Sequence, residues 1–266
     1  MRRVIFLILV AGLAFGVSAS PTSAPHSMAL WRVVHALCVT DMKVSGHPAP
    51  CLEVNPDGYV VLRDLKARTE VLLVPTVRLI GIESPELQAP ESPNYWQAAW
   101  EARRYLDMRT GAAAPREDIG LVVNSIFGRS QDQLHIHVDC VLPEVVASLA
   151  AHRDEIGDAW TPLSFKLAGK TYRARRLDGE DFGDRDPFKL LARGDPEAGA
   201  DMSRQTLAAV GVRGVDGRPG FVLLAATGGT LENPDGASEA LLDHSCAVLD
   251  RSPGALSDLD QQPRTR

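Results

Sequence analysis

Short runs of apolar and β-branched residues alternate along the chain with segments of helical periodicity. Strands are expected at residues 59–64, 70–75, 120–124, 133–141 and 170–177, with a hairpin at 206–212 and 221–226. Helices are expected at residues 31–39, 92–108, 143–153 and 238–249. Because strands joined by short turns pair with one another, the pattern predicts a single α+β domain, a largely antiparallel sheet with flanking helices.

The N-terminus differs in composition from the rest of the chain. Two arginines precede an uncharged run at residues 4–17, which ends in the small-residue pattern Val17-x-Ala19. This pattern is typical of a secretory signal, and the run is shorter than the roughly 20 apolar residues of a spanning helix. We expect a signal peptide at 1–19, with an uncleaved membrane anchor as the alternative. The remaining expected parts are a linker at 20–30, a folded domain at 31–251 and a flexible tail at 252–266.

Composition and charge narrow the range of partners. The 266 residues are 45% hydrophobic and 23% charged, as in ordinary globular proteins, and the formal net charge is −6. An acidic protein has no overall attraction to nucleic acid, so we expect no such partner. The basic strand that carries Arg173, Arg175 and Arg176 is interpreted as a solvated surface, with a phosphate or lipid head-group contact as the alternative.

Four cysteines in an exported chain indicate disulfides, because the compartment beyond the membrane is oxidising. Cys38 and Cys51 flank a segment rich in Gly, Pro and His that closes readily into a ring. Pairing them leaves Cys140 with Cys246, a bridge that ties the middle of the chain to its C-terminal segment. Free thiols are the alternative.

The segment at residues 133–141 carries the most informative side chains. Strand side chains alternate, so His135, His137 and Asp139 share one face, each roughly 6.6 to 7 Å from the next. The opposite face is apolar and is expected to face the core; it carries Leu134, Ile136, Val138 and Cys140.

Two imidazoles and a carboxylate in a row suit either a divalent metal ion or covalent catalysis, in which an imidazole attacks phosphorus. The preceding turn, Gly128-Arg129-Ser130-Gln131, offers backbone N–H groups, a guanidinium, a hydroxyl and an amide. These groups are donors for phosphate oxygens. A metal site does not need so many donors, so a histidine nucleophile is the favoured interpretation.

Two resemblances make the prediction more specific. Gln131 four residues before His135, followed by His137, with Asn124 upstream and Pro143 beyond, resembles the signature of the histidine-triad superfamily. The chain is also similar, over roughly residues 37–249, to the CDP-diacylglycerol pyrophosphatase family. The stretches that carry this second similarity are Leu79 to Pro85, Gly128 to Cys140 and Asp243-His244-x-Cys246.

The resemblance implies a histidine-triad-like fold and hydrolysis of CDP-diacylglycerol to CMP and phosphatidate. The implied location is the periplasmic face of the bacterial inner membrane, or the periplasm if the signal is cleaved, and no cofactor is implied. His137, the central histidine, matches the family nucleophile, and His135 matches the histidine that helps to fix the site. Asn124 and Gln131 match positions that contact or orient phosphate.

The sequence departs from the superfamily at Asp139, which stands where the third histidine is usually found. An ionised carboxylate cannot donate to a phosphate oxygen. Asp139 is therefore expected to hold a histidine, orient water or stay apart from the reaction. The lost donor makes Arg129 and Ser130 the compensating candidates for phosphate binding.

Two other functions stay open on the sequence alone. One is a metal-dependent phosphoesterase with His135, His137 and Asp139 as ligands, and the other is a periplasmic module that binds nucleotides or lipids without turnover. His244 is expected to be structural or exposed to solvent, although a Cys140–Cys246 bridge would bring it close to the central segment.

Overall fold

The computed structural model describes residues 27–65, 67–111 and 113–248. The expected signal or anchor at 1–19 and the expected tail at 252–266 lie outside these residues. Within the described part of the chain, no helix is both long and apolar enough to cross a membrane.

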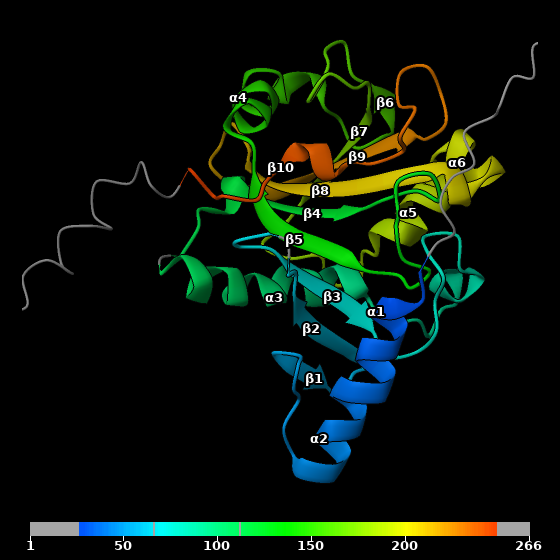
Figure 1. The fold of residues 1–266 in the computed structure, drawn as a ribbon. Coiled ribbons are helices and arrows are strands. Elements are labelled where there is room, and N and C mark those ends of the chain that lie inside the picture. Colours follow the sequence, from blue (N-terminus) through cyan, green and yellow to red (C-terminus); the bar gives the residue numbers. More distant parts are fainter. Residues whose placement is uncertain (1–26, 66, 112, 249–266) are drawn as a thin grey trace, which may run out of the picture.

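Ten strands form one sheet within the described residues, and every pair of neighbouring strands is antiparallel. Its order is β1-β2-β3-β5-β4-β8-β9-β7-β6, with β10 paired to one end of β5 (Figure 1). The strands are β1 (Glu53–Asn55), β2 (Tyr59–Arg63), β3 (Val71–Pro75), β4 (Ile119–Val123), β5 (Ile136–Val141), β6 (Thr161–Pro162), β7 (Arg173–Asp178), β8 (Gln205–Arg213), β9 (Pro219–Thr227) and β10 (Leu242–Asp243). The predicted α+β class and antiparallel sheet are therefore confirmed.

Helices lie on both sides of this sheet. One continuous helical segment opens the described chain and comprises α1 (Ala29–Arg32), the π-helical turn η1 (Val33–Cys38) and α2 (Val39–Ser45). The other α-helices are α3 (Tyr95–Thr110), α4 (Pro143–Ala151), α5 (Pro187–Gly194) and α6 (Pro196–Ala200). Short 3₁₀ turns are η2 (Pro85–Gln88), η3 (Arg116–Asp118), η4 (Arg153–Glu155), η5 (Met202–Arg204) and η6 (Glu239–Leu241).

The main core lies between the sheet and α3. Trp96 and Trp100 of α3 are buried against one face of the sheet, together with Ile136 and Val138 of β5. Asn94 caps this helix by accepting a hydrogen bond from the backbone N–H of Gln97 at 3.2 Å. The helix predicted at 92–108 is thus confirmed, and its tryptophans are core residues, as their i, i+4 spacing indicates.

The opposite face of the sheet is covered by two separate groups of helices. At one end, α1, η1 and α2 pack on β2 and β3, where Val34 and Leu72 belong to one apolar cluster. Further along, Val145 and Leu149 of α4 pack on β4, β8 and β9, in a second cluster that includes Val122. The two coverings are distinct clusters of the core, so this face has a seam between them.

Both expected disulfides are present. Cys38, the last residue of η1, is bonded to Cys51, which lies just before β1, and Cys140 of β5 is bonded to Cys246. Among the cysteines described, none is a free thiol. The second bridge closes a loop of 106 residues. In the chain-entropy model, a loop of that size stabilises the folded state by about 4.7 kcal/mol.

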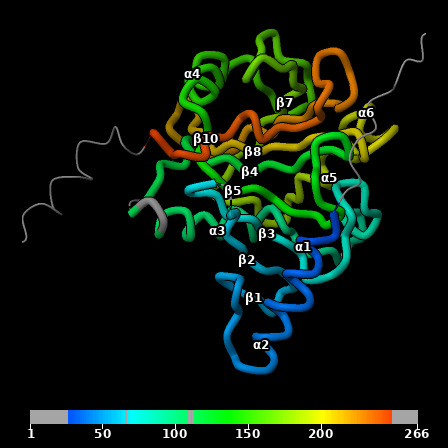
Figure 2. Tube along the Cα trace, viewed as in Figure 1, coloured from blue at the N-terminus to red at the C-terminus, as the bar shows by residue number. Residues whose placement is uncertain are grey.

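The prediction of a helix at residues 238–249 is wrong. This segment forms the short turn η6 and then β10, whose Leu242 pairs with Val141 of β5 (Figure 2). β3 pairs with β5 only at residues 136–138, so the far end of β5 has backbone groups available to β10. Gly120 of β4 leaves room for this strand, because a Cβ there would lie 2.8 Å from a methyl of Leu242. Pairing with the sheet therefore overrides the local helical pattern.

Candidate active site

The predicted site lies in the seam between the two helix coverings. His137 of β5 pairs with Leu72 of β3 on one side and with Val122 of β4 on the other. Side chains opposite each other in a sheet share a face, and these two neighbours belong to the two separate apolar clusters. His137 therefore projects on the face where neither group of helices closes over the sheet.

His135 and His137 lie side by side, as their alternation on the strand predicts. Their ring centroids are 4.8 Å apart, and the rings meet edge to face. The Nδ1 atom of His135 lies 2.8 Å from the carbonyl oxygen of Gln133. In the neutral ring, Nδ1–H donates to that carbonyl, which leaves Nε2 as the unprotonated nitrogen.

His137 is held between two carboxylates. Its Nδ1 lies 2.6 Å from Oε1 of Glu70, a residue that is only 3% exposed just before β3. Its Nε2 lies 3.0 Å from Oε1 of Glu239 in η6, as an ion pair without the alignment of a hydrogen bond. Asn124, after β4, donates its side-chain amide to the same Glu239 carboxylate and accepts a hydrogen bond from the N–H of Ser238.

The two neighbouring histidines have opposite proton affinities. Burial lowers the pKa of His137, but contact with Glu239 and Glu70 outweighs this effect and raises the pKa to about 10. Burial and the adjacent charge of His137 lower the pKa of His135 to about 4. At neutral pH the pair is therefore one imidazolium, His137, beside one neutral imidazole, His135.

The contact with His137 also changes the pKa of the Glu239 carboxyl group. Burial raises its pKa, but the interaction with His137 and the amide of Asn124 outweighs burial and lowers the pKa to about 2. Its side chain is 36% exposed, so it is the member of this group that solvent or a ligand can reach most readily.

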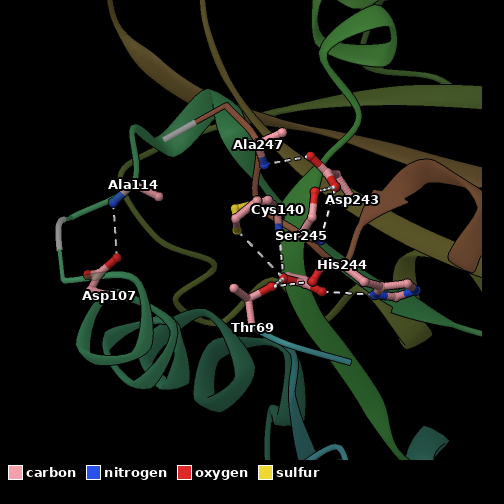
Figure 3. The surroundings of a disulfide bond; sticks show 10 residues. Thr69, Asp107, Ala114, Cys140, Asp243, His244, Ser245 and Ala247 are labelled. Carbon is pink, nitrogen blue, oxygen red and sulfur yellow. Dashed lines mark hydrogen bonds and ion pairs between the residues drawn. A yellow bond between two sulfur atoms is a disulfide. The ribbon is translucent and has the colours of Figure 1, made fainter. Parts of the chain in front are cut away.

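Asp139 lies on the same side of β5 but does not face open space. It is fully buried, and its carboxylate accepts hydrogen bonds from the hydroxyl of Thr69 at 2.6 Å and from Nδ1–H of His244 at 2.9 Å. Figure 3 shows the ring of His244 extending away from Cys140 and its disulfide. The structure thus agrees with one of the roles expected for Asp139, which is to hold a histidine.

A cavity of about 480 Å³ opens over these side chains. Its lining is part polar and part apolar. The polar lining includes Glu70, Ser130, Gln131, His135, His137, Glu239 and His244. The apolar lining comes from the N-terminal helical segment and from β2, β3 and the loop between them; it includes Ala29, Leu30, Val33, Leu62, Leu65 and Leu72.

The side chains of the turn at residues 128–131, which was expected to bind phosphate, lie in two different places. Ser130 and Gln131 line the cavity, and Oε1 of Gln131 accepts a hydrogen bond from the N–H of Leu30 at 3.0 Å. Arg129 is buried away from it, with its guanidinium paired to Glu83 at 2.6 Å and to Asp132 at 3.2 Å. Arg129 is thus a structural cation in the free protein, and its predicted contact with phosphate stays a prediction.

His135, His137 and Asp139, the ligands of the metal-binding alternative, do not form a cluster suited to a metal ion. Among the described residues, the triads of His, Cys, Asp and Glu whose ligand atoms lie within 4.8 Å of one another do not include the combination of His135, His137 and Asp139. One triad consists of Glu70, Asp139 and His244, but Asp139 and His244 are already hydrogen-bonded to each other there.

Three residues that contact the predicted row were not predicted as site residues: Glu70 and Glu239 were not singled out, and His244 was expected to be structural or exposed. Glu70 had a weak signal, since it begins a predicted strand and shares a face with Leu72. His244 had a stronger one, because a Cys140–Cys246 bridge brings its segment to β5. Glu239 had none, because nothing local in a segment that resembles a helix marks a carboxylate that reaches the central strand.

Comparisons with known proteins identify the family. Residues 25–250 match the family described as CDP-diacylglycerol pyrophosphatase. The chain is also similar to a protein of Yersinia pestis named CDP-diacylglycerol pyrophosphatase, with 39% identity over 254 residues that cover 95% of each chain. This chain therefore belongs to the CDP-diacylglycerol pyrophosphatase family.

Proposed function

We propose that this protein hydrolyses the pyrophosphate bond of CDP-diacylglycerol, releasing CMP and phosphatidate through an intermediate in which the nucleotide is bonded to His137. Membership of the family supports the substrate. The observation that carries the chemistry is a buried imidazole that lines a cavity, with the carboxylate of Glu70 at Nδ1 and that of Glu239 beside Nε2.

The first step requires His137 to lose the proton at Nε2. Glu239, 3.0 Å away, is placed to receive it. The transfer converts an ion pair into two neutral groups, which removes the repulsion between the Glu239 carboxylate and an anionic pyrophosphate.

Glu70 keeps the reacting nitrogen in the correct form. By accepting the Nδ1–H of His137 it leaves Nε2 to attack the phosphorus next to cytidine, and it stabilises the positive ring that results. The N–P bond forms as the bond to phosphatidate breaks. Water then attacks the same phosphorus, the N–P bond breaks, and CMP leaves. This is the histidine-triad-like scheme, with a carboxylate added behind the nucleophile.

The mixed lining of the cavity suits a nucleotide lipid. Its polar side chains present groups for the pyrophosphate, whereas its apolar side chains can hold the first methylenes of the diacylglycerol moiety. Leu65, which also lines the cavity, is 98% exposed and extends the apolar lining outward. We expect Leu65→Asp to raise the KM for long-chain CDP-diacylglycerol in vesicles and to leave the KM for a short-chain analogue unchanged.

We also propose that the reaction takes place beyond the cytoplasm, at the periplasmic face of the inner membrane. The N-terminal secretory pattern and the two disulfides support this location. Fractionation of cells that make the full chain tests it, with recovery of the protein from the cytoplasm as the contradicting result.

The direct test of activity is incubation with CDP-diacylglycerol in water enriched in heavy oxygen. The proposal predicts CMP and phosphatidate, with the heavy oxygen in CMP, because water attacks the nucleotide phosphorus. Heavy oxygen in phosphatidate would contradict the intermediate, and the absence of CMP would favour a binding module. Loss of activity in EDTA would favour the metal-dependent alternative, whereas the proposed scheme predicts no change.

A further inference from the structure

The strongest unassigned feature is the hydrogen-bonded pair formed by Asp139 and His244. Asp139 cannot rotate freely, because Oδ1 accepts hydrogen bonds from the Thr69 hydroxyl at 2.6 Å and from the backbone N–H of Cys140 at 2.9 Å. Its other oxygen, Oδ2, is thereby directed at Nδ1 of His244, 2.9 Å away. A buried carboxylate behind Nδ1 fixes the tautomer and the orientation of an imidazole.

The backbone around His244 is fixed as well. The preceding residue, Asp243, pairs with Cys140 in the β10–β5 ladder, and its side chain accepts hydrogen bonds from the N–H groups of Ser245 and Ala247. Two residues beyond His244, Cys246 is bonded to Cys140. Figure 3 shows this arrangement, in which a half-exposed ring extends from a tightly held turn.

His244 and His137 face the same cavity. Both also present Nδ1 to one carboxylate, because Glu70 lies 2.6 Å from Nδ1 of His137 and 4.0 Å from Nδ1 of His244. Since Nε2 lies on the far side of each ring from Nδ1, the two Nε2 atoms are the ones left to face a bound substrate. The cavity thus has three oriented imidazoles, those of His135, His137 and His244, and the proposed function uses only that of His137 as a reacting group.

We propose that His244, positioned by Asp139, is the acid and base of the reaction. The inference rests on the proposed function, because it assigns the proton transfers of that two-step scheme. In the first step, Nε2–H of His244 gives its proton to the phosphate oxygen of phosphatidate as the P–O bond breaks. In the second, the neutral ring takes a proton from water while the water oxygen bonds to the nucleotide phosphorus.

The protons balance over one cycle. The proton that Glu239 took from His137 returns to Nε2 when the N–P bond breaks, and water has restored the proton of His244. Glu239 holds the proton of His137 throughout the intermediate, so it cannot also receive one from water. A second acid–base group is therefore required. His135 carries no proton on Nε2 at neutral pH, because its pKa is lowered to about 4, so it cannot be the acid of the first step. His244 lines the same cavity and is placed for this role.

The electrostatic surroundings of His244 suit an acid in the resting enzyme. The hydrogen bond to Asp139 raises its pKa, and Glu70 and Glu239 raise it further. These carboxylates come from β5, from the residue before β3 and from η6, and Asp243 of β10 adds a further negative charge beside the ring.

The test uses His244→Gln with a CMP ester of p-nitrophenol, whose leaving group departs without a proton. We expect a burst of one equivalent of p-nitrophenolate per enzyme, followed by turnover slowed by about 10²- to 10⁴-fold, because only the second step then needs the base. Mass spectrometry of the quenched variant should find CMP bonded to His137. With CDP-diacylglycerol as substrate, His244→Gln should slow both steps of the reaction.

His152→Gln is the matched control. This histidine lies at the end of α4, stacks on Phe165 and does not line the cavity, so its loss should leave both steps unchanged. Turnover of His244→Gln at the rate of the control, with the adduct still detectable in a rapid quench, would overturn the role of His244 but leave the covalent scheme intact. Turnover without an adduct in the wild-type enzyme and in both variants would instead contradict the proposed function.

Asp139→Asn provides a second test that does not remove the ring. As a positioning residue, Asp139 should shift the pH profile, because losing its charge lowers the pKa of His244. We expect the limb of the kcat profile that belongs to His244 to move to lower pH, with KM unchanged. A uniform loss of kcat with the limb in its original place would contradict the assignment of that limb to the pair.

Discussion

Strands β5 and β7 both carry rows of ionisable side chains, yet only β5 lines the proposed site. On β7, Arg173 forms ion pairs with Asp195 at 2.6 Å and with Glu197 at 3.0 Å. Arg176 forms an ion pair with Asp178 at 2.7 Å. On β5, His137 is fixed at Nδ1 by Glu70, and its ring lines a cavity together with Glu239, which lies 3.0 Å from Nε2. A row of charges can perform chemistry only where its partners orient one atom and leave another facing open space.

Removing the nucleophile should have the largest effect. His137→Gln should reduce kcat by at least ~10⁴-fold, which is the scale seen when a covalent nucleophile is lost. The variant should remain folded, with both disulfides, in circular dichroism and in a thiol assay. CMP release at the wild-type rate by this variant would contradict the assignment of β5.

Removing the carboxylate behind the nucleophile should have the next largest effect. Glu70→Gln should lower kcat by about 10²- to 10⁴-fold, because the ring of His137 loses the acceptor that fixes its tautomer. Steady-state kinetics should place the loss in kcat rather than in KM. An unchanged kcat would mean that Glu70 only fills space beside the ring.

A substitution on β7 should lower the stability of the protein and leave its activity unchanged. Arg173→Met leaves Asp195, which is only 2% exposed, without its cation, and removing one partner of such a buried pair costs about 3 kcal/mol or more. Denaturant unfolding should show this loss, and kcat of the folded fraction should match the wild type. A selective fall in kcat would revive the idea that this strand binds phosphate.

His137 of β5 and His135, the residue before this strand, should also differ in how they link pH to stability. The pKa of His135 is lowered from 6.5 to about 4, so below pH 6.5 the unfolded chain binds a proton that the folded chain does not. Stability should therefore fall as the pH drops from 6.5 towards 4, and His135→Gln should reduce this slope. An identical slope in both proteins would contradict the lowered pKa.

His137 should act in the opposite direction. Its pKa is raised from 6.5 to about 10, so its contribution to stability is complete below pH 6.5 and is lost as the pH rises towards 10. Unfolding free energies measured across the alkaline range should show a smaller decline in His137→Gln than in the wild type.

The smallest effect is expected at Arg176. Its partner Asp178 is 72% exposed, and an exposed ion pair contributes only about 0–1 kcal/mol. Arg176→Gln should therefore change neither kcat nor the unfolding midpoint measurably. A large loss of kcat or of stability would show that the importance of an arginine on β7 does not depend on whether its carboxylate partner is buried.

Much of this arrangement could be predicted from local pattern. Alternation placed His135 and His137 together on one face of a strand, and the ring geometry confirms it. The two disulfide pairings followed from export and from the short segment between Cys38 and Cys51. These features depend on neighbours in sequence or on a small number of possible pairings.

The rest depends on contacts between distant segments. Glu239 meets His137 from about 100 positions further along the chain, and the segment that carries it has a local pattern that favours a helix. Arg129 looked like a donor for phosphate, but its charge is taken up by Glu83, which lies 46 positions earlier. Side-chain partners of this kind are decided by packing, which no local periodicity encodes.

The most direct test of the account is a mass spectrum of the wild-type protein quenched during turnover of CDP-diacylglycerol. The account predicts a mass increase of one CMP group, located on the peptide that contains His137 and absent from His137→Gln. Full turnover with no nucleotide on the protein, or with the nucleotide on a different residue, would contradict it.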